Sequence, residues 1–291
     1  MSNASEPNTI QAAFDVARAT LKANNIATPD LDASLLLEAA TGTSALQRIT
    51  HPNSEISELG WRTLATYINR RANNEPLHRI TGSREFYGLS LRLNKSTLVP
   101  RPDTEILVDT VLPFVKQCCR DKNECTILDL GTGSGAIALA LLNEEPIARA
   151  TGTDISLEAL TIAEQNAVAL SLDERYRTLQ SDWFENVTGQ FDLIVSNPPY
   201  IASKIIETLD SEVRNFDPSV ALDGGEDGLD AYKVIASQCS SFLKNDGRIA
   251  AEIGYDQKSS VAALFEAAGL SLIEAVDDLS GQNRVLFFAL S

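Results

Sequence analysis

The stretch that decides the fold is residues 125–142, which read CTILDLGTGSGAIALALL. The short apolar segment that ends at Leu130 predicts a buried strand, and the run of alanine, isoleucine and leucine after the glycines predicts a helix. Gly131, Gly133 and Gly135 lie between them, where glycine permits positive φ and lets a ligand approach the backbone. A strand, a glycine loop and a helix in this order are typical of the nucleotide site of a doubly wound α/β fold.

Asp154 follows at the carboxyl end of the next expected strand, residues 150–155. In this fold an acid at that place accepts hydrogen bonds from ribose hydroxyls, a role that suits NAD and S-adenosylmethionine equally. With Ala136 at its last position, the glycine loop also fits the dinucleotide pattern G-x-G-x-x-G/A. The alternative role for Asp154 is an N-cap of the helix LEALTIAEQNA, although Ser156 caps at least as well and leaves Asp154 available to a ligand.

Two candidate adenine contacts lie in SDWF, residues 181–184, after a third apolar stretch at residues 176–180. Asp182 is placed to accept a hydrogen bond from the adenine amine, and Trp183 to cover the ring. A tryptophan at the end of a strand is also often part of the core. Both interpretations of Trp183 therefore stay open.

The segment FDLIVSNPPYI, residues 191–201, joins an apolar strand to a rigid polar turn. The two prolines fix φ and remove two N–H donors, so that backbone carbonyls there can face outward as unpaired acceptors. Asn197 adds an acceptor and a donor on one side chain, and Tyr200 offers a flat face for stacking. These residues suit a planar group that carries an NH₂, such as adenine, cytosine or a carboxamide; the alternative is a simple tight turn.

DLGTGSG, GTDIS, SDWF and FDLIVSNPPYI together resemble the class I S-adenosylmethionine methyltransferases that methylate amino groups with an NPPY loop. More narrowly, residues 76–109, DPSVALDGGEDGLDAYK at residues 217–233 and GQNRVLFFAL near the C-terminus are similar to the protein-(glutamine-N(5)) methyltransferases of translation release factors, the PrmC/HemK family. The resemblance runs from about Pro76 to Leu290 and is weaker over the first helices.

The resemblance implies a Rossmann-like, seven-stranded sheet with its last strand antiparallel, preceded by a small all-helical domain. It implies S-adenosyl-L-methionine as cofactor and methylation of the side-chain amide nitrogen of the glutamine in the Gly-Gly-Gln motif of peptide chain release factors. The implied cofactor-binding residues are Gly131, Thr132, Gly133, Ser134, Gly135, Asp154, Asp182, Trp183 and Asn197. The implied catalytic residues are Asn197, Pro198 and Tyr200, and the implied substrate-binding residues are Asn197, Pro198, Pro199 and Tyr200.

Composition limits the class of protein. An apolar content of 44% in 291 residues is that of a globular chain with one large or two ordinary domains. No apolar run approaches the roughly 20 residues that span a bilayer, and the start MSNASEPNT has neither the basic nor the apolar part of a signal peptide. Four cysteines without a C-x-x-C pair, with only two histidines, predict a reduced cytoplasmic chain without a metal site.

The net charge of −16, from 40 acids and 24 bases, bears on the partner. Proteins that grip duplex DNA usually carry a basic patch. The local basic group Arg70, Arg71, His78, Arg79 and Arg84 is interpreted as a solvated helix end and linker. We therefore expect no direct nucleic-acid binding and no membrane association, and favour a protein partner with a basic surface, such as a factor that binds ribosomal RNA.

Three parts are expected along the chain. Residues 1–75 are a helical bundle, since Ile10, Phe14, Ala17 and Leu21 recur at helical spacing, and the bundle is expected to recognise the substrate. Residues 76–100 are a linker with a β-hairpin, and residues 101–291 are the methyltransferase domain. Strands are expected near residues 126–130, 150–154, 176–180, 191–196, 247–253, 271–276 and 284–290. Alternation with helices predicts a parallel sheet, and the short final connection predicts an antiparallel last strand.

Alternatives remain for the reaction. An adenine amino-methyltransferase of DNA or RNA would flip its base into the same loop, but acidity and the lack of a recognisable target-recognition domain argue against it. A glutamine of a large-subunit ribosomal protein is a closer alternative. A cofactor-binding module without turnover and a nicotinamide dehydrogenase are disfavoured. Neither needs a turn such as residues 197–200, whose acceptors can hold an amide NH₂.

Overall fold

The computed structural model describes residues 7–290, and the chain divides into two compact units, Met1–Gly82 and Ser83–Ser291. Most of MSNASEPNT, on which the expectation about a signal peptide rests, lies outside the described residues. Each unit has a hydrophobic core of its own. They are therefore described one at a time.

The first unit is entirely helical in its described part, apart from a single isolated bridge. Its helices are α1 (Ile10–Ala23), α2 (Pro29–Thr41), α3 (Ala45–Thr50), α4 (Glu58–Ala72) and α5 (Leu77–Thr81). The apolar face of α1 is buried at Ile10, Phe14 and Leu21, at the expected helical spacing. Ile80 of α5 belongs to the same core, so this unit extends beyond the break at Pro76.

The second unit begins with a hairpin of β1 (Ser83–Phe86) and β2 (Leu89–Arg92) and continues as alternating strands and helices. The strands of its main sheet are β3 (Cys125–Leu130), β4 (Ala148–Asp154), β5 (Tyr176–Gln180), β6 (Phe191–Ser196), β7 (Leu243–Glu252), β8 (Leu270–Asp277) and β9 (Asn283–Leu290). The helical elements are η1 (Pro102–Thr104), α6 (Glu105–Lys122), α7 (Ala136–Glu144), α8 (Leu157–Ala169), α9 (Ser203–Ile206), α10 (Ser211–Phe216), η2 (Ser219–Ala221), α11 (Asp230–Phe242) and α12 (Lys258–Ala267).

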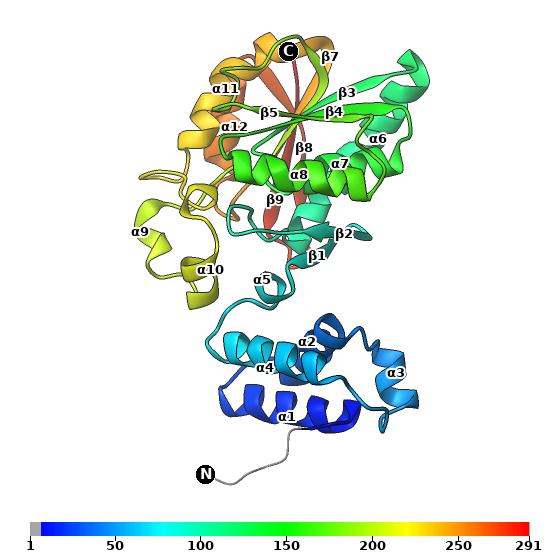
Figure 1. Cartoon of the computed structure of the whole chain (residues 1–291). Helices are drawn as coiled ribbons and strands as arrows, with labels where there is room; N and C mark the ends of the chain where they lie inside the picture. The colour runs from blue at the N-terminus through cyan, green and yellow to red at the C-terminus, as the bar shows by residue number, and fades with distance from the viewer. Residues whose placement is uncertain (1–6, 291) are drawn as a thin grey trace. The chain divides into compact units, whose positions relative to one another are not determined.

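The seven strands lie in the order β5-β4-β3-β6-β7-β9-β8, and β9 runs antiparallel to both of its neighbours. The predicted sheet with an antiparallel last strand is therefore confirmed. Helices α6, α7 and α8 cover one face of the sheet, and α11 and α12 cover the other (Figure 1). Residues of one strand alternate between the two cores, as Ile127 and Leu128 do in β3, because successive side chains point to opposite faces.

This topology places the site. The chain starts the sheet at β3, adds β4 and β5 on one side, and then returns to add β6 and β7 on the other. In such sheets ligands bind beyond the carboxyl ends of the strands, at the point where the strand order reverses. The glycine loop follows β3 and Asn197 follows β6, and these two strands are hydrogen-bonded neighbours.

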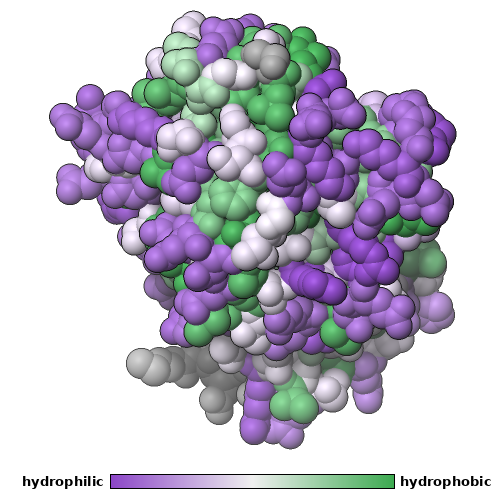
Figure 2. Space-filling model, turned by 90° about the horizontal axis from the view of Figure 1, so that it is seen from above, coloured by the Kyte–Doolittle hydropathy of each residue, from purple (hydrophilic) through white to green (hydrophobic). Residues whose placement is uncertain are grey.

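The surface seen in Figure 2 is mainly hydrophilic, with apolar side chains gathered in a band across it. Across residues 7–290, none of the helices combines the length and the apolar character that a membrane span requires.

Candidate active site

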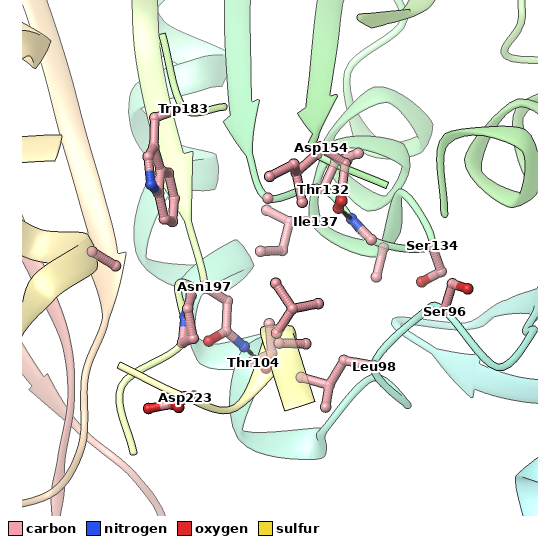
Figure 3. A pocket seen from close by; sticks show the side chains of 18 of the residues that line it. Ser96, Leu98, Thr104, Thr132, Ser134, Ile137, Asp154, Trp183, Asn197 and Asp223 are labelled. Carbon is pink, nitrogen blue, oxygen red and sulfur yellow. Dashed lines mark hydrogen bonds between the residues drawn. The ribbon is translucent and has the colours of Figure 1, made fainter. Parts of the chain in front are cut away.

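The sequence motifs meet at one cavity of about 350 Å³ beyond the carboxyl ends of β3, β4 and β6. Asp154 and Trp183 lie at one end of it, and Asn197 and Thr104 lie together at the other (Figure 3). The motif residues that line it are Gly131, Thr132, Gly133, Ser134, Asp154, Asp182, Trp183, Asn197 and Pro199. We call it the cofactor cavity.

The glycine loop has the backbone conformation that only glycine adopts easily. Gly131 and Gly133 have φ of 69° and 56°, and the space in which a Cβ would stand is open at both. Gly135, with φ of 85°, is the N-cap of α7, and a Cβ there would come within 2.9 Å of Leu139 Cδ1. Gly131 and Gly133 thus border the cavity, whereas Gly135 permits close packing at the start of the helix.

Asp154 is not the N-cap of α8, because Ser156 is, and its carboxylate accepts backbone hydrogen bonds beside the glycine loop. Its Oδ2 accepts a hydrogen bond from the backbone N–H of Gly133 at 2.9 Å, and its Oδ1 accepts from Ser156 N–H at 2.9 Å. Ser156 itself caps α8 through the N–H of Ala159 at 3.2 Å. Burial raises the pKa of Asp154, while the N–H groups that it accepts from oppose that change. The carboxylate therefore fixes the glycine loop and also faces the cavity.

Asp129 lies beneath the loop and was not singled out by the sequence analysis. It is fully buried, and the Thr132 hydroxyl donates to its Oδ2 at 2.6 Å. Burial raises the pKa of Asp129 to about 7, although hydrogen bonds from Thr132 and Ala138 counteract it. The sequence did not predict a role for Asp129, because an acid within an apolar strand has no local pattern that identifies its partner. The structure shows that this partner is Thr132.

Trp183 and Asp182 lie on the cavity wall after β5. Trp183 adopts a left-handed φ of 47°, which is unusual for a bulky residue. It is partly buried and packs against the core beneath α11 and α12, and it also lines the cofactor cavity, so its contact with adenine stays a prediction. Asp182 is exposed at the rim.

The NPPY turn separates the cofactor cavity from a second cavity of about 400 Å³, which we call the acceptor cavity. Pro199 lines the first cavity, Pro198 and Tyr200 line the second, and Asn197 lines both. Among residues 7–290 no group donates a hydrogen bond to the Pro198 carbonyl or to Asn197 Oδ1. Two acceptors are therefore available in the wall between the cavities.

The walls of the two cavities include residues that the sequence analysis did not assign: Thr104 in the cofactor cavity, Glu252 in the acceptor cavity and Arg101 in both. Asn197 Nδ2 donates to Thr104 Oγ1 at 3.1 Å, and the Tyr200 hydroxyl donates to Glu252 Oε1 at 3.2 Å. Arg101 lines both cavities and forms an ion pair with Asp217 at 2.9 Å. These residues come from distant segments of the chain, so no local pattern could have grouped them.

The segment after Tyr200, residues 202–230, is rich in acids and glycine, and hydrogen bonds connect it to the Asn-Pro-Pro-Tyr turn. Ile201 and the residues Leu222 and Gly224 exchange backbone hydrogen bonds at 3.0 and 2.9 Å. Gln257 Nε2 donates to the Tyr200 carbonyl at 3.0 Å and to the Gly228 carbonyl at 3.1 Å. Because Ala221 also lines both cavities, this segment forms part of their wall.

One group of potential metal ligands lies elsewhere in the described chain. The ligand atoms of Cys118, Cys125 and Asp192 all lie within 4.8 Å of one another. The Asp192 carboxylate already accepts from Lys122 at 2.8 Å and Lys244 at 2.7 Å, and burial raises the pKa of both thiols. An ion there would compete with two ammonium groups.

The cofactor cavity fits S-adenosylmethionine. Open space above Gly131 and Gly133 admits a ligand close to the backbone, Asp154 supplies an acceptor for hydroxyls, and Trp183 supplies an aromatic wall. The cavity volume of about 350 Å³ lies in the range of small-molecule sites. Asn197 belongs to the part of its wall that also lines the second cavity.

Comparisons with known proteins agree with this geometry. Residues 105–213 match the model of the methyltransferase small domain, and residues 12–82 match that of the PrmC N-terminal domain. A methyltransferase from Pyrococcus furiosus has the same fold, with a TM-score of 0.53 at 18% identity over 76% of this chain and 98% of that one. A ribosomal protein L11 methylase from Lactobacillus delbrueckii has a TM-score of 0.50 at 23% identity over 69% and 85%. Fold and site together define a class I S-adenosylmethionine-dependent methyltransferase.

Full-length relatives narrow the class. The release factor glutamine methyltransferase of Agrobacterium fabrum is 49% identical over 96% of this chain and 97% of its own length. That of Caulobacter vibrioides is 44% identical over 96% and 95%. This chain belongs to the family of release factor glutamine methyltransferases. The resemblance drawn from the sequence motifs, and with it the cofactor, is confirmed.

Proposed function

We propose that this chain methylates the side-chain amide nitrogen of the glutamine in the Gly-Gly-Gln motif of peptide chain release factors, in the cytoplasm, with S-adenosyl-L-methionine as methyl donor. One observation carries the proposal: Asn197 belongs to the walls of both cavities, with unengaged acceptors on its side chain and on Pro198. Membership of the release factor glutamine methyltransferase family supports it independently.

The wall suits a carboxamide. A glutamine NH₂ has two donors, and Asn197 Oδ1 and the Pro198 carbonyl are two acceptors that no described residue occupies. Accepting both hydrogens orients the nitrogen toward the cofactor cavity. Tyr200 lines the acceptor cavity beside them and provides a flat surface for the amide plane.

S-adenosylmethionine supplies an activated methyl group on its sulfonium, so the protein mainly has to align the acceptor. The lone pair of an amide nitrogen is delocalised into its carbonyl, which makes the nitrogen a poor nucleophile. Acceptors that hold its two hydrogens raise the electron density on nitrogen as the new bond forms. The Asn-Pro-Pro-Tyr turn itself contains no strong base. We therefore expect the proton to leave after methyl transfer, when the nitrogen has become acidic.

The test is methylation of purified release factor with labelled S-adenosylmethionine, followed by mass mapping of the methylated residue. Changing the substrate glutamine to glutamate should abolish labelling, because it removes both donors. Changing it to asparagine should also abolish labelling, because the nitrogen would stop about 1 Å short of its position. Label in adenine of DNA or RNA, or in a ribosomal protein, without label in release factor would overturn the proposal.

We further infer that the helical unit recognises the protein substrate. Its core includes Ile80, so the natural boundary for its removal is Gly82. A chain that lacks residues 1–82 should bind S-adenosylhomocysteine normally and methylate a short Gly-Gly-Gln peptide at nearly the full rate, but methylate whole release factor much more slowly. Equal losses on peptide and protein would show that the helical unit only supports the catalytic unit.

A further inference from the structure

Glu252 is a buried carboxyl for which the reaction above has no role. It ends β7, is 1% exposed, and lines the acceptor cavity with Asn197 and Pro198. Its Oε1 accepts from the Tyr200 hydroxyl at 3.2 Å, while its Oε2 is buried and receives no hydrogen bond from any residue between 7 and 290. A buried carboxylate oxygen without a partner is costly, so its presence beside Asn197 and Pro198 indicates a function.

The groups around Glu252 come from three other elements and from the loop after β6. Thr104 and Asp103 belong to η1, Tyr200 follows β6, Arg284 lies in β9, and Tyr232 of α11 donates to the Glu252 backbone carbonyl at 2.7 Å. Arg284 is engaged by Asp278 at 2.9 Å and by Asp103 at 3.5 Å, so its charge is shared. Burial raises the pKa of Glu252 to about 7, while Thr104, Arg284 and Tyr200 counteract it.

We call the two acceptors Asn197 Oδ1 and the Pro198 carbonyl the clamp. Thr104 contacts Asn197 and also affects Glu252. Asn197 Nδ2 donates to Thr104 Oγ1 at 3.1 Å (Figure 3), which leaves the hydroxyl proton of Thr104 free to be donated elsewhere. An ionised carboxylate is only an acceptor. Thr104 also lowers the pKa of the Glu252 carboxyl, as a hydroxyl that turns its proton toward a carboxylate does. This polarity would run from the Asn197 amide through the Thr104 hydroxyl toward Glu252.

We propose that Glu252 and Thr104 are positioning residues that hold the Asn197 side chain with Oδ1, rather than its NH₂, facing the acceptor amide. The two ends of an asparagine side chain have nearly the same shape, so shape alone does not choose between them. The reversed orientation would set NH₂ against the NH₂ of the substrate, with donor facing donor. This inference rests on the proposed function, in which Asn197 Oδ1 accepts from the substrate amide. It adds the residues that keep Oδ1, and not the NH₂ group of Asn197, facing the substrate.

Protonation of Glu252 would remove the preference for the orientation in which Asn197 Oδ1 faces the acceptor amide. A carboxylic acid can donate to Thr104, whose own proton can then turn toward Asn197 Oδ1 and favour the reversed side chain. The active form therefore contains the carboxylate. Since burial places the pKa of Glu252 at about 7, the rate constant kcat should rise with pH across that region.

The kinetic test uses Glu252→Gln, Thr104→Val and Thr104→Ser, with Thr110→Val as a matched control. Thr110 lies on α6, and within the described part of the chain its hydroxyl bonds to the Ile106 carbonyl alone, at 2.7 Å, away from both cavities. Glu252→Gln and Thr104→Val should lower kcat by about tenfold or more, the scale of a lost charge-assisted hydrogen bond. KM and S-adenosylhomocysteine affinity should change little, and Thr104→Ser should recover most of the rate lost in Thr104→Val.

Two further measurements separate positioning from a merely structural role. In an Asn197→Ala background, Thr104→Val and Glu252→Gln should cost little more, because the side chain that they orient is gone. The rise of kcat with pH near 7 should disappear in Glu252→Gln. Additive losses, an unchanged pH profile, or losses matched by Thr110→Val would overturn the proposal.

A measurement without turnover distinguishes this inference from the proposed function. With isotope-labelled glutamate, the carboxyl carbon of Glu252, assigned with Glu252→Gln, should titrate near 7 and shift to higher pH in Thr104→Val, since the Thr104 hydroxyl lowers its pKa. A titration unaffected by Thr104→Val overturns the network even if release factor is methylated. A shifted titration without methylation of release factor overturns the proposed substrate alone.

Discussion

The two cavities that share Asn197 are built in different ways. The cofactor cavity takes its main polar groups from the turns after successive strands: the glycine loop after β3, Asp154 at the end of β4 and Trp183 after β5. The acceptor cavity is lined by residues of four separate segments, among them Arg101, Asn197, Leu222 and Glu252. A nucleotide site can thus lie in consecutive motifs, whereas the cavity proposed to select the acceptor depends on contacts between distant segments.

The largest expected effect comes from the residue that both cavities share. Asn197→Ala should lower the methyl transfer rate by about a hundredfold or more, the scale of losing one preorganised partner of the transition state. S-adenosylhomocysteine affinity, measured by calorimetry, should change far less, because the remaining wall of the cofactor cavity is intact. If the affinity for S-adenosylhomocysteine fell as much as the rate, Asn197 would act by binding the cofactor and not by holding the acceptor.

Asp154→Ala tests the cofactor side by itself. The loss of charge-assisted hydrogen bonds to ribose should weaken S-adenosylhomocysteine binding by about ten- to a hundredfold, with the rate at saturating cofactor largely kept. Asp154→Asn is the matched variant, because it keeps the shape and one acceptor for Gly133 N–H while it removes the charge. An unchanged dissociation constant in both variants would reduce Asp154 to a support for the glycine loop and Ser156.

A smaller effect should follow from a change outside both cavities. Asp192 at the start of β6 is buried between Lys122 and Lys244. Burial opposes its charge, but hydrogen bonds from the two lysines and Thr126 outweigh burial and hold the pKa of Asp192 well below its usual range. Since both lysines are about one third exposed, Asp192→Asn should cost roughly 1–2 kcal/mol of unfolding free energy.

This prediction has a pH signature. Because the folded-state pKa of Asp192 is lowered, its stabilisation is present above the ordinary carboxyl pKa of about 4 and is lost as the pH falls below it. Thermal unfolding of the two proteins should therefore differ at neutral pH and converge in acid. A variant that lost cofactor or acceptor binding selectively at neutral pH would contradict the separation of this edge from both cavities.

Much of the molecule could be predicted because its signals are local. The strand before Gly131, the loop and the helix after it follow from apolar runs and from glycine's access to positive φ, and the structure gives φ of 69° there. The antiparallel last strand followed from the short connection before β9. Asp154 was placed at the end of β4 by its position at the end of the expected strand, and Ser156 is the cap of α8, so the sequence was right to leave Asp154 available to a ligand.

By itself, the sequence determined the sheet and the motifs that line the cofactor cavity, and it singled out the residues of the proposed clamp. It could do so because hydrophobic period, turn chemistry and strand ends act within a few residues of one another. Only the tertiary structure decided that Pro199 faces the cofactor cavity while Pro198 and Tyr200 face the other, and that Gly135 packs on Leu139. It alone brought Thr104 to Asn197, 93 residues apart in the chain, and Glu252 to Tyr200, 52 apart. Hydrogen bonds over such separations depend on how the strands and helices pack, so no local pattern carries them.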